Sequence, residues 1–166
     1  MGRNSAKSVA LGGVMAALAV VIMCMGGIIP VATYVCPMLC AMLLAVVLRL
    51  TGRRIAWAWY AAVAVLSLLL GPDKEAAAVF LFLGYYPIIK PWIDGRKLPV
   101  LWKLAVFNLS IGAMYTILLY VFRLEQVIRD FSEFGLVLTL VTLFLGNVTL
   151  FLLDILLSRF GVRRKS

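Results

Sequence analysis

The sequence predicts an all-α membrane protein, a compact bundle of six transmembrane helices in one domain that covers residues 1–166. Three observations carry this prediction: 64% of the residues are hydrophobic, only 14% are charged, and the charges gather in short clusters between apolar runs. In a soluble domain about a quarter of the residues are charged. The composition therefore places the chain in a lipid bilayer, and we expect no separate soluble domain at this length.

The first apolar run, residues 8–29, is long enough to cross a membrane by itself. It contains no charged residue, and as a helix it is about 33 Å long, against about 30 Å for the hydrocarbon core. The run is longer than the apolar region of a usual signal peptide, and further spans follow it. We therefore expect the first run to be a retained transmembrane helix.

Five further spans follow, and proline, glycine or charged residues separate them. Pro37 is expected to open the second span after a short loop that contains Tyr34, and Gly71-Pro72-Asp73 to end the third and cap the fourth. An alternative topology has five spans with one re-entrant pair, because the third and fourth runs are short. The predicted ranges are 37–50, 55–70, 75–90, 99–122 and 134–157.

The basic residues predict the orientation of the chain. With six spans, both termini lie on one side, and that side receives thirteen of the sixteen Lys and Arg residues. By the positive-inside rule both termini are cytoplasmic in a multi-pass protein of the cell membrane. The net charge of +9 does not indicate nucleic-acid binding, because the basic residues are distributed among short loops.

Residues for catalysis or metal binding are scarce. Histidine is absent, and the three cysteines lack metal-ligand spacing. We therefore expect no catalytic residue, no metal and no cofactor, and the protein is not predicted to be an enzyme. Asp154 is the one carboxylate deep inside a span and requires a partner there. Lys90, Lys103 and Arg159 are the candidates, and the sequence does not choose among them.

Aromatic and polar residues on the predicted outer side form a candidate small-molecule site. Two alternatives stay open: Asp73 and its neighbours could serve only as a helix cap, and Asn147 could serve only in helix packing. The segment 123–133 is predicted to be either an amphipathic helix or a lid over the site. The candidate binding residues are Tyr34, Asp73, Lys74, Glu75, Tyr115 and Asn147.

The first span also carries small residues at helical spacing. Ser8, Gly12 and Ala16 share one face, and Gly13 and Ala17 lie beside them. Small residues allow two helix backbones to approach closely within a membrane. We expect this face to pack against another helix, and in particular against a helix of another protein.

At this point the pattern resembles a known family, the substrate-binding S component of energy-coupling-factor (ECF) transporters. The resemblance rests on six short spans, the small-residue face of the first helix, and the segment GPDKEAAAVFLFLGYYPIIK, which is similar to a stretch in uncharacterised S-component-like proteins of Gram-positive bacteria. It implies uptake of a small nutrient, a vitamin or related micronutrient, and partnership with a transmembrane coupling subunit and cytoplasmic ATPases. It also implies that Gly12 and Ala16 stand where the family docks that subunit. The chain has no phosphate-binding loop of its own, so a partner must hydrolyse ATP.

A second resemblance favours a different class of function. The rod-shape-determining membrane protein of the cell-wall elongation machinery has a similar length and number of spans. This alternative implies a membrane scaffold that contacts wall-synthesis proteins and binds no small molecule. Binding of a small molecule would therefore separate the two hypotheses.

Overall fold

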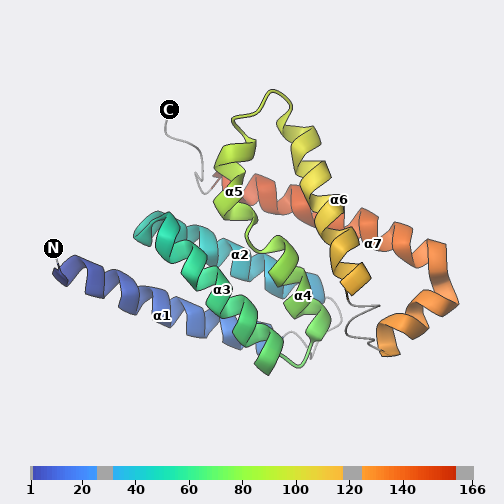
Figure 1. Cartoon of the computed structure of the whole chain (residues 1–166), viewed down its shortest axis with the longest axis horizontal. Helices are drawn as coiled ribbons and strands as arrows, with labels where there is room; N and C mark the ends of the chain where they lie inside the picture. The colour runs from blue at the N-terminus through green and yellow to red at the C-terminus, as the bar shows by residue number, and fades with distance from the viewer. Residues whose placement is uncertain (1, 26–31, 118–124, 160–166) are drawn as a thin grey trace.

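The computed structural model describes the backbone of residues 2–25, 32–117 and 125–159. Within these ranges it does not describe the side chains of residues 2–5, 8, 32, 115, 125–139 and 142. The described residues form seven α-helices and no strand (Figure 1). The prediction of an all-α fold is thus confirmed.

Three long helices, α1 (Gly2–Met25), α2 (Ala32–Thr51) and α3 (Arg53–Leu70), pack side by side at one end of the molecule (Figure 1). Gly52 alone joins α2 to α3. Its backbone has φ 86°, a left-handed conformation that side chains with a Cβ rarely adopt. This glycine allows α3 to reverse direction at once and to pack against α2.

The fourth apolar run folds as two helices, α4 (Lys74–Leu83) and α5 (Tyr86–Ile93). Pro87 explains the break, because it has no N–H to donate to the carbonyl of Leu83 and its ring crowds that carbonyl. Gly84 and Tyr85 form the turn between the two helices. Together α4 and α5 still make one apolar segment, Lys74–Ile93, that is long enough to cross a membrane.

The last two helices are α6 (Pro99–Ile117) and α7 (Glu125–Arg159), and α5 and α6 run across the direction of α1 to α3 (Figure 1). Gly146 allows α6 and α7 to meet closely. A Cβ on Gly146 would lie 2.7 Å from Ile111 Cδ1 and 3.0 Å from Phe107 Cζ. The glycine therefore gives two α6 side chains the space that a larger residue would occupy.

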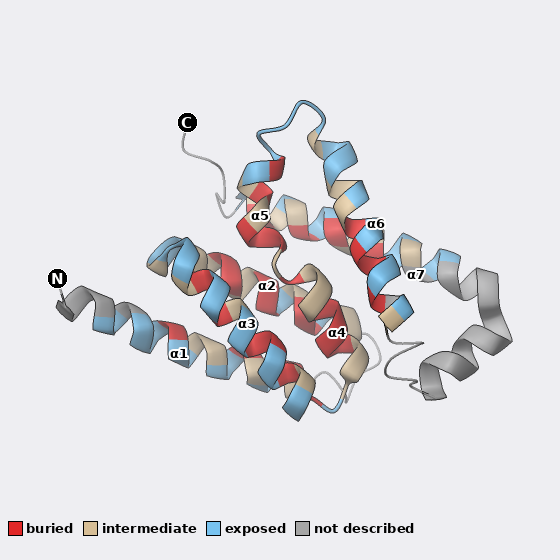
Figure 2. Ribbon diagram, viewed as in Figure 1, coloured by how far each residue is buried: buried red, intermediate tan, exposed pale blue. Residues whose placement is uncertain are grey.

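Apolar residues lie both inside and outside the molecule. Buried residues concentrate where α2 meets α3, α4 and α5 (Figure 2). Large apolar side chains are also exposed on the outer faces: Leu109 is 77% exposed, Leu69 70% and Phe144 69%. Among the described residues, three segments are long and apolar enough to cross a membrane, namely Thr33–Thr51, Arg53–Leu70 and Lys74–Ile93.

The helix boundaries differ from the predicted spans in several places. Helix α2 begins at Ala32, so Tyr34 lies in its first turns and Pro37 lies inside it. Because Pro37 has no N–H, the carbonyl of Thr33, four residues earlier, lacks its usual helical donor. The fourth span is divided at Gly84 and Tyr85. Residues 125–133 belong to α7, whereas their side chains and residues 123–124 lie outside the described part, so the lid hypothesis is not addressed.

Candidate functional site

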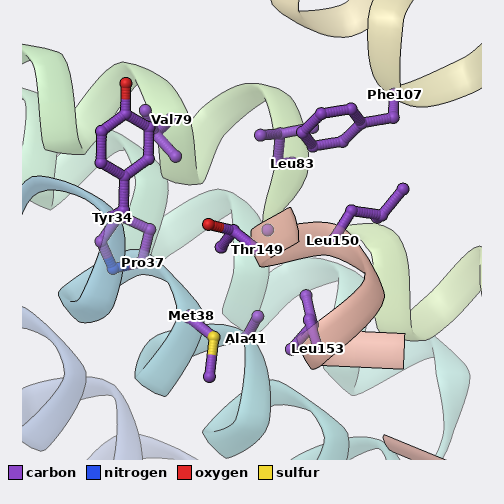
Figure 3. A pocket seen from close by; sticks show the side chains of 11 residues that line it. Tyr34, Pro37, Met38, Ala41, Val79, Leu83, Phe107, Thr149, Leu150 and Leu153 are labelled. Atoms are coloured by element: carbon purple, nitrogen blue, oxygen red, sulfur yellow. The ribbon is translucent and has the colours of Figure 1, made fainter. Parts of the chain in front are cut away.

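A small pocket lies where four helices meet, and Figure 3 shows the side chains around it. Helix α2 forms one wall of the pocket, and α4 with the turn after it forms a second wall. Helices α6 and α7 close the remaining side. The pocket has a volume of about 30 Å³, which is about one water molecule's share of liquid water. Its lining residues are Tyr34, Pro37, Met38, Ala41, Val79, Leu83, Gly84, Phe107, Thr149, Leu150 and Leu153.

The lining is almost wholly apolar. Tyr34 and Thr149 supply the two side-chain hydroxyl groups of the pocket (Figure 3). The Thr149 hydroxyl donates to the backbone carbonyl of Leu145 at 2.8 Å, so part of its hydrogen-bonding capacity is used within α7. Such a site suits an apolar ligand with few polar groups.

The break between α4 and α5 forms part of the pocket wall, because Gly84 lines the pocket. A broken helix leaves carbonyl groups without their usual partners, and in an apolar setting these groups need other donors. The hydroxyl of Tyr60 on α3 donates to the carbonyl of Leu81. The Tyr85 hydroxyl lies 3.0 Å from Ser110 Oγ on α6, within hydrogen-bond distance. Contacts from α3 and from α6 thus stabilise the turn between α4 and α5.

Asp73 and Lys74 make the contacts of helix caps. The Asp73 carboxylate accepts from the backbone N–H of Ala76 at 2.9 Å and from the Thr33 hydroxyl at 2.8 Å. The Lys74 ammonium donates to the carbonyls of Leu68 at 2.8 Å and Gly71 at 2.9 Å, at the end of α3. Glu75 is half-buried in the first turn of α4. None of the three acidic or basic residues lines the pocket.

Asn147 lies on α7, and its side chain contacts α6. Its side-chain amide donates to the Leu143 carbonyl at 2.7 Å and to Asn108 Oδ1 at 3.3 Å. Its own Oδ1 is buried and has no hydrogen-bond partner among the described residues. These contacts belong to helix packing, and Asn147 does not line the pocket. Tyr115 lies near the end of α6, and its side chain is outside the described part.

Of the predicted binding residues whose side chains are described, therefore, Tyr34 is the one that lines the pocket. Sequence reasoning missed Gly84, Phe107 and Thr149, which lie in the turn after α4, on α6 and on α7 and meet only in the fold. The proline that follows Tyr85 and Tyr86 is the one sequence signal that marks this region, since it predicts a helix break.

Asp154 lies in a cluster of charges at the junction of α5, α6 and α7. Its carboxylate forms an ion pair with Lys90 and another with Lys103 at 3.0 Å, and it accepts from the Tyr86 hydroxyl at 2.7 Å. Asp94 completes the cluster, 3.3 Å from the Lys90 ammonium and 2.7 Å from that of Lys103. The two carboxylates thus balance the two ammonium groups. Of the three candidates, Lys90 and Lys103 are the partners of Asp154.

The small residues of α1 divide between two faces. Gly12 is buried, and a Cβ on it would lie 4.0 Å from Ile55 Cγ2 on α3. Ala16 packs against the buried core that α1 shares with α2 and α3. Gly13 and Ala17 are exposed, and the side chain of Ser8 is outside the described part. Gly12 and Ala16 therefore pack within this chain, and Gly13 and Ala17 face outwards.

Comparison with known proteins identifies no relative of this chain. No family model, curated protein or solved structure matches the chain.

Proposed function

We propose that this chain is a membrane-embedded substrate-binding subunit for uptake of a small nutrient, of the kind found in ECF transporters. The observation that carries the proposal is the pocket between α2, α4, α6 and α7, whose wall contains the break between α4 and α5. Membrane transporters commonly place their substrate sites at such broken helices, near the middle of the bilayer. The apolar lining favours a largely apolar substrate, such as a vitamin or a related micronutrient.

The proposed placement is a bundle of six spans with both termini in the cytoplasm, α4 and α5 together forming one span. The positive-inside rule supports it, as does the turn between α5 and α6. There the Arg96 guanidinium lies 4.1 Å from the ring centre of Trp92 and 4.7 Å from that of Trp102. Tryptophan and arginine together are typical of a membrane interface.

The exposed face of α1 supports a role for partner proteins. Gly13 and Ala17 are exposed, and α1 contributes no residue to the pocket. A coupling subunit could therefore contact α1 while the pocket holds its ligand. Transport would be powered by cytoplasmic ATPases bound to that subunit, with the present chain as the binding component.

Thermal unfolding of the purified protein, measured against a panel of vitamins, their precursors and nucleobases, tests the proposal. A ligand that binds only the folded state stabilises it by about 2.7 kcal/mol at a concentration one hundred times its Kd. We expect one compound to raise the unfolding temperature of the wild type and of Val35→Trp. Met38→Trp should lose the effect, because Met38 lines the pocket, whereas Val35 is exposed on the same helix.

One specific observation favours a second candidate function, the membrane scaffold of the cell-wall elongation machinery. The pocket of about 30 Å³ is much smaller than typical ligand sites of about 300–1,000 Å³. A binding subunit must therefore open this pocket by moving its helices, whereas a scaffold needs no opening. If no compound in the panel stabilises the protein, the scaffold is the better hypothesis. Stabilisation that persists in Met38→Trp would place the ligand elsewhere.

A further inference from the structure

A larger cavity runs along α2, between α1 and α7, and shares no lining residue with the pocket described above. It has a volume of about 280 Å³, and Arg49 is its one charged lining residue. Ile22 of α1 borders one side and Leu157 of α7 the other. The lining residues are Ile22, Leu39, Met42, Leu43, Ala45, Val46, Arg49 and Leu157.

The charge in this groove stands at one end. From Leu39 to Arg49 the α2 backbone advances about 15 Å, at 1.5 Å per residue. Arg49 is exposed and has no hydrogen-bond or ion-pair partner among the described residues. The groove therefore combines an apolar lining with one free guanidinium group at its end.

We propose that this groove binds an acyl chain of an anionic phospholipid, with the phosphate of the head group paired to Arg49. Charge complementarity supports this occupant, because guanidinium groups pair with carboxylates and phosphates through parallel hydrogen bonds. Under the proposed orientation, Arg49 stands at the cytoplasmic surface, where anionic lipids are concentrated. The proposal rests on that membrane placement and is independent of the substrate pocket.

The lining of the groove also supports a lipid chain as the occupant. Seven of its eight lining residues are apolar, and the eighth, Arg49, carries the one charge. A phospholipid likewise combines apolar acyl chains with a charged head group at one end.

Retention of lipid by the full chain tests the proposal. The protein would be reconstituted in phosphatidylcholine bilayers that contain a minor fraction of phosphatidylglycerol or palmitate, and bound lipid counted by mass spectrometry after mild extraction. We expect Arg49→Gln to reduce retention of the anionic phospholipid about fivefold, the effect of one basic residue near an anionic surface. Arg54→Gln is the matched control, since Arg54 is exposed and does not line the groove.

A second pair of variants tests the apolar part of the groove. Val46→Phe fills the groove and should reduce retention, whereas Leu50→Phe, on the same helix but outside the groove, should not. Retention of phosphatidylglycerol in preference to palmitate supports the proposal, whereas retention of palmitate alone would overturn it. Equal retention of phosphatidylcholine, or equal effects of Arg49→Gln and Arg54→Gln, would overturn the proposal.

Discussion

At the scale of single residues, Asp154 shows how this chain accommodates charge in an apolar interior. The side chain of Lys90 is only 1% exposed and forms an ion pair with Asp154. Removing an ion from water costs several kcal/mol, and a close partner of opposite charge offsets that cost. Lys103, Tyr86 and Asp94 supply the remaining contacts. The cluster therefore links α5, α6 and α7, because the charge of Asp154 on α7 is paired with Lys90 on α5 and Lys103 on α6.

Replacing Asp154 tests this arrangement. Asp154→Asn removes the charge that pairs with Lys90 and Lys103, so we expect the free energy of unfolding to fall by about 3 kcal/mol, the low end for a broken buried pair because Asp94 remains. Denaturant titration of the purified protein measures the change. Asp94→Asn is the control: its side chain is 31% exposed, and it should cost about 1 kcal/mol. Equal losses in the two variants would contradict the special role of Asp154.

At the scale of helices, the contact between α6 and α7 depends on Gly146. Its missing side chain is the space that Ile111 and Phe107 occupy. Small residues at such positions are typical of helices that pack closely inside a membrane. Gly112, on the other helix of the pair, is exposed and has no atom near its missing Cβ. The two glycines therefore have different structural roles.

Alanine substitutions distinguish these two roles. Gly146→Ala should be less favourable than Gly112→Ala by about 1–3 kcal/mol, because the new methyl group must displace Ile111 Cδ1 and the Phe107 ring, which offsets the gain in helix propensity. Gly112→Ala should be neutral or slightly stabilising, since alanine favours helix and meets no neighbour.

A double variant isolates the cause. Ile111→Val removes the Cδ1 methyl, so Gly146→Ala should cost less in that background than in the wild type. Thermal unfolding of the four proteins gives the coupling. Additive effects would show that the contact with Ile111 does not limit the approach of α7.

At the scale of the whole molecule, the pocket, the groove and the exposed small residues of α1 involve different sets of residues. Helices α1, α2 and α3 pack together, and exposed Gly13 and Ala17 lie on α1. The small pocket lies between α2, α4, α6 and α7, and the groove at Arg49 lies along α2. Helix α2 contacts both sites and is the central element of the fold.

The proposed orientation predicts which turns are accessible from outside the cell. In a variant without Cys24, Cys36 and Cys40, a single cysteine at Pro72 should react with a membrane-impermeant thiol reagent added to intact cells. A single cysteine at Gly95 should react only after the membrane is opened. Both positions are exposed in turns between helices. Labelling of Gly95→Cys from outside would reverse the topology.

Composition and local pattern determined the helical class and the positions of most helices. Apolar runs and the charges between them are properties of consecutive residues, so they can be read without the fold. The same holds for Asp73, whose position after Gly71-Pro72 predicts the cap that it forms. Pro37 did not start a helix, since α2 begins five residues earlier, at Ala32.

The tertiary structure alone decided which residues share a site. Tyr34, Gly84 and Thr149 come together because α2, the turn after α4, and α7 converge, and no local pattern records how segments far apart in sequence meet. The same applies to Asp154: its need for a partner followed from its burial, but the choice of Lys90 and Lys103 required the packing of α5 and α6 against α7. Periodicity acts over a few residues, whereas these contacts depend on helix crossing and side-chain volume throughout the chain.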